Sequence, residues 1–313
     1  MAEKPKTINI DRITNWIHEK KCILILGPDV AYNFEKSLYS ELYNYLIDND
    51  VDCKFDSFDE LFSSSSYNNV FFTDEVADFL RQLKPAPIYK QIAEIPFHTI
   101  ISLTPDLLLK QTFDDNNFDY HFSYYHKEVG CKIEDGIKPS EQKPLIYNYL
   151  GVYKQHTSLV LCFNDLFSYL SSILGAYKLN DVIREQLMEA KYLLFLGIKF
   201  DKWYSKLILQ LLNIGKNNLK QASVKEIQQT QQLESQNFII DFYQNEMKIS
   251  FIEQAGNDII SLIHSYFKAN QSLRKPKIAT QTLQNITNII NVNDSADVTI
   301  IQNVSDSNIN INK

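Results

Sequence analysis

Residues 10–27, IDRITNWIHEKKCILILG, contain the pattern that decides the fold class. Ile10, Ile13 and Ile17 recur at the spacing of one helical face. The run CILILG that follows is short, continuously apolar and ends in Gly27, as is typical of a parallel strand buried on both faces. A helix, a buried strand and a tight turn at the strand's carboxyl end open a nucleotide-binding α/β unit.

The same unit recurs along the chain, because apolar strand-like runs alternate with helix-like segments. This alternation predicts an α/β fold of Rossmann-like, doubly wound type, with a mostly parallel six-stranded sheet. The six predicted strands are residues 22–27, 98–103, 144–151, 158–163, 191–197 and 248–253.

Composition changes along the chain predict its domain organisation. Residues 1–268 form the main domain, within which the aromatic stretch 34–95 is a helical insertion or cap over the sheet. Residues 216–236 are rich in Gln and Asn, which predicts a surface loop or a solvated helix. Residues 269–282 are polar and basic with a proline, so they are interpreted as a linker.

The C-terminal tail, residues 283–313, alternates Ile and Val with Asn, Thr, Ser and Asp. This period of two predicts short strands, and VNDSADVTI (292–300) resembles VSDSNINI (304–311). A tail this short buries no core alone, so it is expected to pair with its own domain, with sister chains in a homo-oligomer, or with a partner protein. The alternative is a disordered polar tail.

The overall charge excludes some classes of partner. The 313 residues carry a net charge of −7, which argues against a general binder of nucleic acid or of membrane surfaces. The chain has no apolar run of about 18 residues and begins with a polar segment, so we expect neither a membrane span nor a signal peptide. The expected location is the cytoplasm.

The cysteines and histidines do not form a metal-binding pattern. Cys22, Cys53, Cys131 and Cys162 are widely spaced and include no CxxC pair, and the six histidines form no HxxxH motif. Free thiols and no metal site are therefore expected.

Three segments in this order resemble bacterial sirtuin-like domains associated with antiviral defence. They are WIHEKKCILILGPDVA, then PFHTIISLTPDLLL, then PLIYNYLGVY continuing to SLVLCFNDLFSYL and FLGIKFDKWYSKLILQLL. The resemblance covers roughly residues 10–268. It implies a nucleotide-binding fold that acts on NAD, with a Gly-rich turn near the phosphates, an asparagine that positions the ribose or a water, and a histidine that serves as general base.

This chain departs from the family pattern at the reactive positions. The family asparagine falls on Thr104 and the family histidine on Leu150, which cannot accept a proton. The turn keeps Gly27 but places a carboxylate, Asp29, where a second glycine is expected, and a carboxylate repels phosphate unless a cation offsets it. The positions expected to line a nucleotide site are Gly27, Pro28, Asp29, Ser102, Thr104, Asp106, Gly151 and Gly197.

Three functions remain open at this point. The first is a catalytically degenerate sirtuin-like protein that acts in assembly, sensing or as an effector in a bacterial anti-phage system. The second is an active NAD hydrolase that uses a different catalytic pair, with Asp106 or Asp29 as the carboxylate and His126, His121 or His98 as the base. The third is a sensor that binds NAD or ADP-ribose without chemistry.

Overall fold

The computed structural model describes residues 9–63, 70–131, 133, 136–212, 220–225, 241–247 and 249–277. The account that follows concerns the compact unit Met1–Lys275. The tail 283–313 lies outside the described residues, so its predicted strands stay a prediction.

A mostly parallel sheet forms the centre of this unit. Its eight strands are β1 (Cys22–Leu26), β4 (Thr99–Ser102), β5 (His121–His126), β6 (Gly130–Cys131), β7 (Leu145–Asn148), β8 (Tyr192–Leu196), β9 (Lys220–Lys225) and β10 (Ile249–Glu253). They lie in the order β10-β9-β8-β1-β4-β7-β5-β6, and β6 alone among them runs antiparallel to its neighbour. The predicted α/β class and the mostly parallel sheet are confirmed, although the sheet has more strands than the predicted six.

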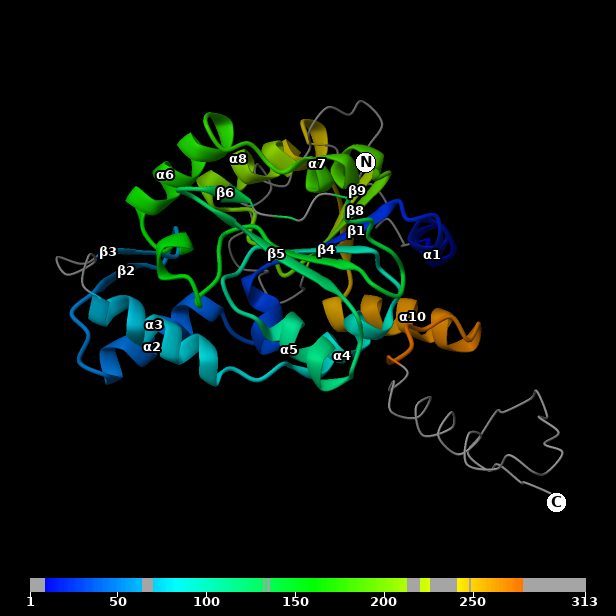
Figure 1. Cartoon of the computed structure of the whole chain (residues 1–313), viewed down its shortest axis with the longest axis horizontal. Coiled ribbons are helices and arrows are strands. Elements are labelled where there is room, and N and C mark those ends of the chain that lie inside the picture. The colour runs from blue at the N-terminus through cyan, green and yellow to red at the C-terminus, as the bar shows by residue number, and fades with distance from the viewer. Residues whose placement is uncertain are drawn as a thin grey trace, which may run out of the picture. The chain divides into compact units, whose positions relative to one another are not determined.

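Helices cover the sheet on both sides (Figure 1). The α-helices are α1 (Ile10–His18), α2 (Leu38–Asp48), α3 (Val70–Gln82), α4 (Pro87–Glu94), α5 (Leu108–Asp115), α6 (Phe163–Leu174), α7 (Asp181–Glu189), α8 (Trp203–Leu212) and α10 (Gly256–Ala269). Two 3-10 helices, η1 (Pro28–Tyr32) and η2 (His156–Ser158), lie in loops.

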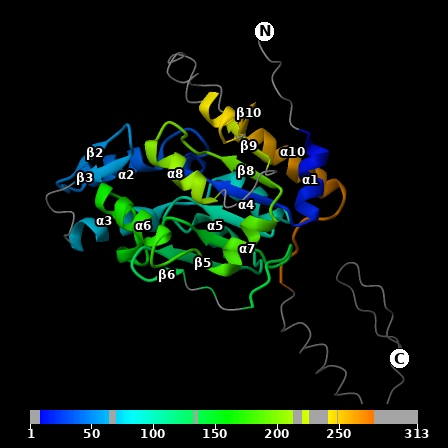
Figure 2. The same cartoon turned by 90° about the horizontal axis from the view of Figure 1, so that it is seen from above.

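The predicted insertion, residues 34–95, contains α2, α3 and α4, and also a small antiparallel hairpin. Strands β2 (Lys54–Asp56) and β3 (Leu61–Ser63) form this hairpin. Residues 57–60 connect them and are called the hairpin turn below. The hairpin lies at the end of the molecule that carries α2 and α3 (Figures 1 and 2).

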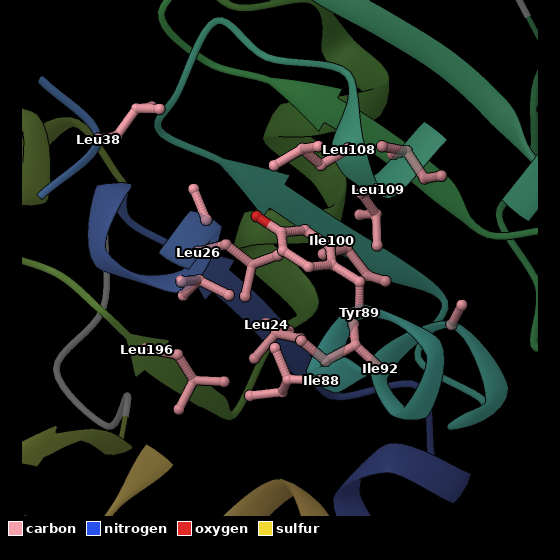
Figure 3. Close-up of a cluster of buried hydrophobic side chains, with 14 of the residues drawn as sticks. Leu24, Leu26, Leu38, Ile88, Tyr89, Ile92, Ile100, Leu108, Leu109 and Leu196 are labelled. Carbon is pink, nitrogen blue, oxygen red and sulfur yellow. The ribbon is translucent and has the colours of Figure 1, made fainter. Parts of the chain in front are cut away.

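Successive side chains of a strand point to opposite faces of the sheet, and each face is covered by helices. The strand sequences are therefore continuously apolar. In β1, Leu24 and Leu26 belong to the core that also includes α1 to α5 and α10. Ile23 and Ile25 belong to the opposite core, which α6, α7 and α8 cover. On the first face the ring of Tyr89 from α4 lies among leucine and isoleucine side chains of β1 and β4 (Figure 3). Both faces are buried, so neither face of the strand can carry polar side chains.

The predicted strand at 158–163 is wrong. That segment contains the end of η2 and the first residue of α6, and its contribution to pairing is one isolated bridge between Cys162 and Phe62. The reason is a helix cap: Asp165 Oδ2 accepts the backbone N–H groups of Leu161 (3.1 Å) and Cys162 (3.3 Å). These two backbone N–H groups take part in the N-terminal cap of α6 and so do not pair with a neighbouring strand.

The Gln- and Asn-rich segment 216–236 was predicted to be a loop or a solvated helix. Residues 220–225 instead form β9, which pairs in parallel with both β8 and β10. The prediction for these residues is wrong because pairing on both edges fixes a strand whose own sequence has little strand character.

Arg274 fastens the C-terminal end of the described chain to the domain. Its guanidinium donates to the carbonyl oxygens of Ala93, Phe97 (2.6 Å) and Glu141 (2.7 Å), and its Cζ lies 4.9 Å from the ring centroid of Phe113. Burial lowers the pKa of Arg274 to about 9. Arg274, within the segment 269–282 that was predicted to be a linker, is therefore buried in the domain.

Candidate functional site

The candidate site lies where the direction of strand addition reverses. After β1 the chain adds β4 on one side, and it later returns to add β8 on the other side of β1. Ligands of open α/β sheets bind in the crevice outside the carboxyl ends of the strands at such a switch point. Leu26 pairs in register with both Ser102 and Leu196, so the loops after β1, β4 and β8 leave the sheet at one level.

A cavity of about 50 Å³ opens at this edge, enough space for a small number of water molecules. Its wall is mostly apolar and comes from the loops after several strands, from α8 and from the insertion. The residues that line it are Pro28, Tyr39, Glu60, Leu103, Leu150, Ile198, Lys199, Lys202, Tyr204, Ser205, Ile208 and Leu209.

One lysine of this wall is shared by two carboxylates. Lys199 Nζ lies 2.5 Å from Glu60 Oε1 and 3.6 Å from Asp29 Oδ1, and the hydroxyl of Ser37 also donates to Glu60. Burial alone would lower the pKa of Lys199, but the two carboxylates outweigh it and raise that pKa. Burial raises the pKa of Asp29 to about 6 against the attraction of Lys199, and the charge of Glu60 adds to the rise.

The residues that follow Lys199 bind the hairpin turn. Lys202 Nζ donates to the carbonyl oxygen of Phe58. Trp203 Nε1 donates to Asp59 Oδ2 at 3.1 Å, and the hydroxyl of Tyr204 donates to Asp59 O at 2.9 Å. The hairpin turn of the insertion is therefore held by Lys202 and by the first two residues of α8.

The glycine turn after β1 is packed against the loop after β8. Gly27 N donates to Leu196 O at 2.8 Å, and Asp29 N donates to Gly197 O at 3.3 Å. A Cβ on Gly27 would lie 2.1 Å from Gly197 O, so only glycine allows this approach. Both amides are engaged within the protein.

The loop after β4 forms a buried hydrogen-bond network of hydroxyl, amide, backbone and carboxyl groups. Ser102 Oγ lies 2.8 Å from Thr104 Oγ1. Asn148 Nδ2 donates to Thr104 O (3.1 Å) and to Asp106 O (2.7 Å), while Asp106 Oδ1 accepts the N–H of Leu108 at 3.0 Å. Burial raises the pKa of Asp106. The predicted site residues Ser102, Thr104 and Asp106 thus come together, but behind the cavity wall and not in it.

The loop after β7 brings an aliphatic side chain to the crevice. Leu150, at the position where the resemblance places a histidine, lines the cavity. Gly151 has a φ of +84°, and a Cβ there would lie 2.1 Å from Ser158 O. Ser158 Oγ accepts the N–H of Val152 at 3.0 Å, which closes this loop on itself. Gly151 therefore serves a close backbone approach.

Two candidate bases lie at the opposite edge of the sheet. His98 immediately precedes β4, and its backbone carbonyl accepts the N–H of Leu145. Burial lowers the pKa of His98 to about 4, and the charge of Lys20 adds to this effect. His121 is the first residue of β5, which runs parallel to β7, so it also lies at the amino ends of the strands.

His126 is at the crevice edge, but its ring is used within the protein. It ends β5, its Nε2 lies 3.0 Å from Thr157 Oγ1, and its Nδ1 accepts the N–H of Glu128 at 3.1 Å. Both ring nitrogens therefore position the loops around β5.

Sequence analysis found only part of the cavity. Pro28, Asp29 and Leu150 were predicted to be near it, but Glu60 and Lys202 were not singled out. Glu60 comes from the insertion and meets Lys199 across 139 residues of sequence, a distance over which spacing carries no information. The available signal was Lys199 itself, a lysine just after a buried strand and its glycine.

Within the described ranges no group of three or more His, Cys, Asp or Glu side chains is placed to hold a metal ion. The four cysteines are free thiols. None of the helices in the described ranges combines the length and the apolar character that crossing a bilayer requires.

No family model and no curated protein matches the sequence. Among solved structures, one described as "Structural Basis for the Mechanism and Regulation of Sir2 Enzymes" aligns over 85% of this chain and 100% of its own, with a TM-score of 0.42 and 10% identity. The chemistry of the crevice is therefore described from the residues of this chain and not from that alignment.

Proposed function

We propose that the chain is a catalytically degenerate sirtuin-like protein that acts by binding and assembly, as a component of a bacterial anti-phage defence system, and does not cleave NAD. The defence role comes from the resemblance of the three sequence segments. The degenerate site is supported by the side chains found around the crevice.

The observation that carries this proposal is the wall of the cavity at Leu150. A ribose hydroxyl there would face an aliphatic side chain that cannot take a proton. Thr104, at the asparagine position, has its hydroxyl within hydrogen-bond distance of Ser102 and its carbonyl bound to Asn148. His126, at the same sheet edge, has its Nε2 within hydrogen-bond distance of Thr157 Oγ1.

The test is NAD turnover by the purified full-length protein, followed as loss of NAD and release of nicotinamide by chromatography. We expect no turnover above a protein-free control, with the Thr104→Ala variant run in parallel. Turnover that Thr104→Ala or Asp106→Asn abolishes would contradict the proposal and would show a rebuilt catalytic site.

A non-catalytic sensor of NAD or ADP-ribose is the second candidate. Lys199 and Lys202 in the cavity wall favour it, because ammonium groups at a switch point can pair with phosphates. Calorimetry with ADP-ribose separates it from a pure scaffold: saturable heat without turnover supports the sensor, and no heat supports the scaffold.

The tail, residues 283–313, is proposed to couple the chain to itself or to a partner protein by strand pairing. Light scattering of the full chain and of a chain ending at residue 282 tests this. We expect a larger mass per particle for the full chain than its added residues explain. Equal oligomeric states would contradict a role in self-assembly.

A further inference from the structure

The hairpin turn contacts residues 199–204, which end in the first turn of α8. In this contact the donors come from residues 199–204 and the acceptors come from the hairpin turn. Four donor groups from Lys199, Lys202, Trp203 and Tyr204 converge on three consecutive residues of the turn. The acceptors are the carboxylates of Glu60 and Asp59 and two backbone carbonyl oxygens.

The donor side holds two ammonium groups, each of which also lies near a carboxylate outside the turn: Asp29 is 3.6 Å from Lys199 and Asp201 is 3.8 Å from Lys202. The side chain of Lys202 is only 5% exposed and that of Lys199 is 23% exposed, and burying an ammonium group is unfavourable unless an acceptor meets it. Both lysines line the cavity. Phosphate oxygens accept several charge-assisted hydrogen bonds at once, which suits two ammonium groups beside an indole N–H and a phenol.

The acceptor side is held in an imperfect way. Glu60 has a φ of +55°, a left-handed conformation that is unfavourable for a residue with a Cβ. Asp59 Oδ1 is buried and has no hydrogen-bond partner among the described residues, and burial raises the pKa of Asp59. The unfavourable backbone of Glu60 and the unpartnered oxygen of Asp59 weaken the binding of the turn to the donors of residues 199–204. An external ligand has neither of these unfavourable terms.

We propose that the hairpin turn is an internal acidic ligand of the crevice, and that a phosphate-bearing small molecule displaces it from Lys199 and Lys202. The external ligand and the turn compete for the same donors, so the cavity enlarges as the turn leaves. This inference rests on the proposed function in one respect: the ligand is bound and is not cleaved.

Binding of inorganic pyrophosphate, measured by calorimetry, tests the competition. The double variant Asp59→Asn, Glu60→Gln keeps the shape of the turn and removes its charges. We expect it to bind pyrophosphate about tenfold more tightly than the unaltered chain, because two amides compete less strongly than two carboxylates for the donors of Lys199 and Trp203. The matched control is Glu41→Gln, which removes a carboxylate of the same insertion that pairs with Lys36 at 3.2 Å, and it should leave the affinity unchanged.

Lys199→Met, added to the double variant, should abolish the increase in pyrophosphate affinity. Circular dichroism reports whether each variant folds, and Lys199→Arg, which keeps the charge, should retain most of the binding. The proposal is overturned if the double variant binds no more tightly than the unaltered chain, or if its binding survives Lys199→Met.

Trp203 gives a direct signal of displacement, because its indole donates to Asp59. The chain has one other tryptophan, Trp16, so a Trp16→Phe background isolates this signal. Saturating pyrophosphate should change Trp203 emission, and an unchanged emission on binding would show that the turn stays in place. NAD cleavage by the full-length chain would contradict the proposed function and would leave these binding results unaffected.

Discussion

The loops after β4 and β8 leave the sheet at the same edge but carry opposite kinds of polar chemistry. The β4 loop contains no ion pair among the described residues, and Asn148 binds its Thr104 and Asp106 carbonyl oxygens. The β8 loop is charged, and its Lys199 is bound to Glu60, which comes from the insertion. The first arrangement maintains the shape of the sheet edge, whereas the second connects the β8 loop to the insertion.

This difference indicates where change can occur in the molecule. A buried hydrogen-bond network without an ion pair is lost only when its loop unfolds, because each freed group remains buried. A charged contact that lines a cavity can exchange one partner for another. The β8 side is therefore the side on which an external anion can act.

The largest expected effect is at Gly27, which follows β1 and packs against the loop after β8. Gly27→Ala places a Cβ 2.1 Å from the carbonyl oxygen of Gly197, and the backbone must move to relieve the clash. We expect the free energy of unfolding to fall by about 3 kcal/mol, at the upper end of overpacking effects, in urea denaturation. Gly136→Ala is the control, because at φ +80° it meets no atom within 4 Å and should cost only about 1 kcal/mol. Equal losses would contradict the close packing of the two loops.

The β4 side should respond strongly to loss of one amide. Asn148→Ala leaves the carbonyl oxygens of Thr104 and Asp106 buried without this donor, and we expect a loss of about 2 kcal/mol in the free energy of unfolding. Asn49→Ala is the control, since that exposed amide makes one bond, 2.8 Å to Tyr45 O, and should cost less than about 1 kcal/mol. A loss as small as that of the control would remove the contrast between the loops.

The β8 side should respond to pH through Asp29. Its pKa in the folded protein, about 6, lies above the ordinary 3.8, so the folded state binds more protons than the unfolded state between these values. The free energy of unfolding therefore falls as pH rises from about 4 to about 6, by up to about 2 kcal/mol after allowance for partial exposure. The charged groups that face Asp29 are Lys199, Glu60 and Asp201. Asp29→Asn should remove this part of the slope in urea denaturation at several pH values, and identical slopes for both proteins would contradict it.

The sequence was sufficient to predict the α/β class and the strands β1, β4, β7, β8 and β10. Apolar runs such as that of β1 need both faces covered, and the alternation with helices fixes the α/β class. It was not sufficient at 158–163, where the carboxylate of Asp165 takes the donors that a strand would use. It also missed β9, whose place depends on its two neighbours.

The candidate site was predicted only where it is local in sequence. Pro28 and Leu150 follow strands of the sheet, so their loops were expected at the carboxyl edge. Glu60 enters the site from the insertion, and only the fold brings it to Lys199. Its charge, spacing and neighbours in the sequence carry no sign of that contact.

The central claim is that the insertion is held over the crevice through Glu60 and Lys199. A double-mutant cycle of Glu60→Gln and Lys199→Met, measured as free energies of unfolding in urea, tests it most directly. We predict a coupling energy of about 1–2 kcal/mol, because the 2.5 Å contact is largely buried. A coupling energy near zero would show that the two side chains act independently and would contradict the account.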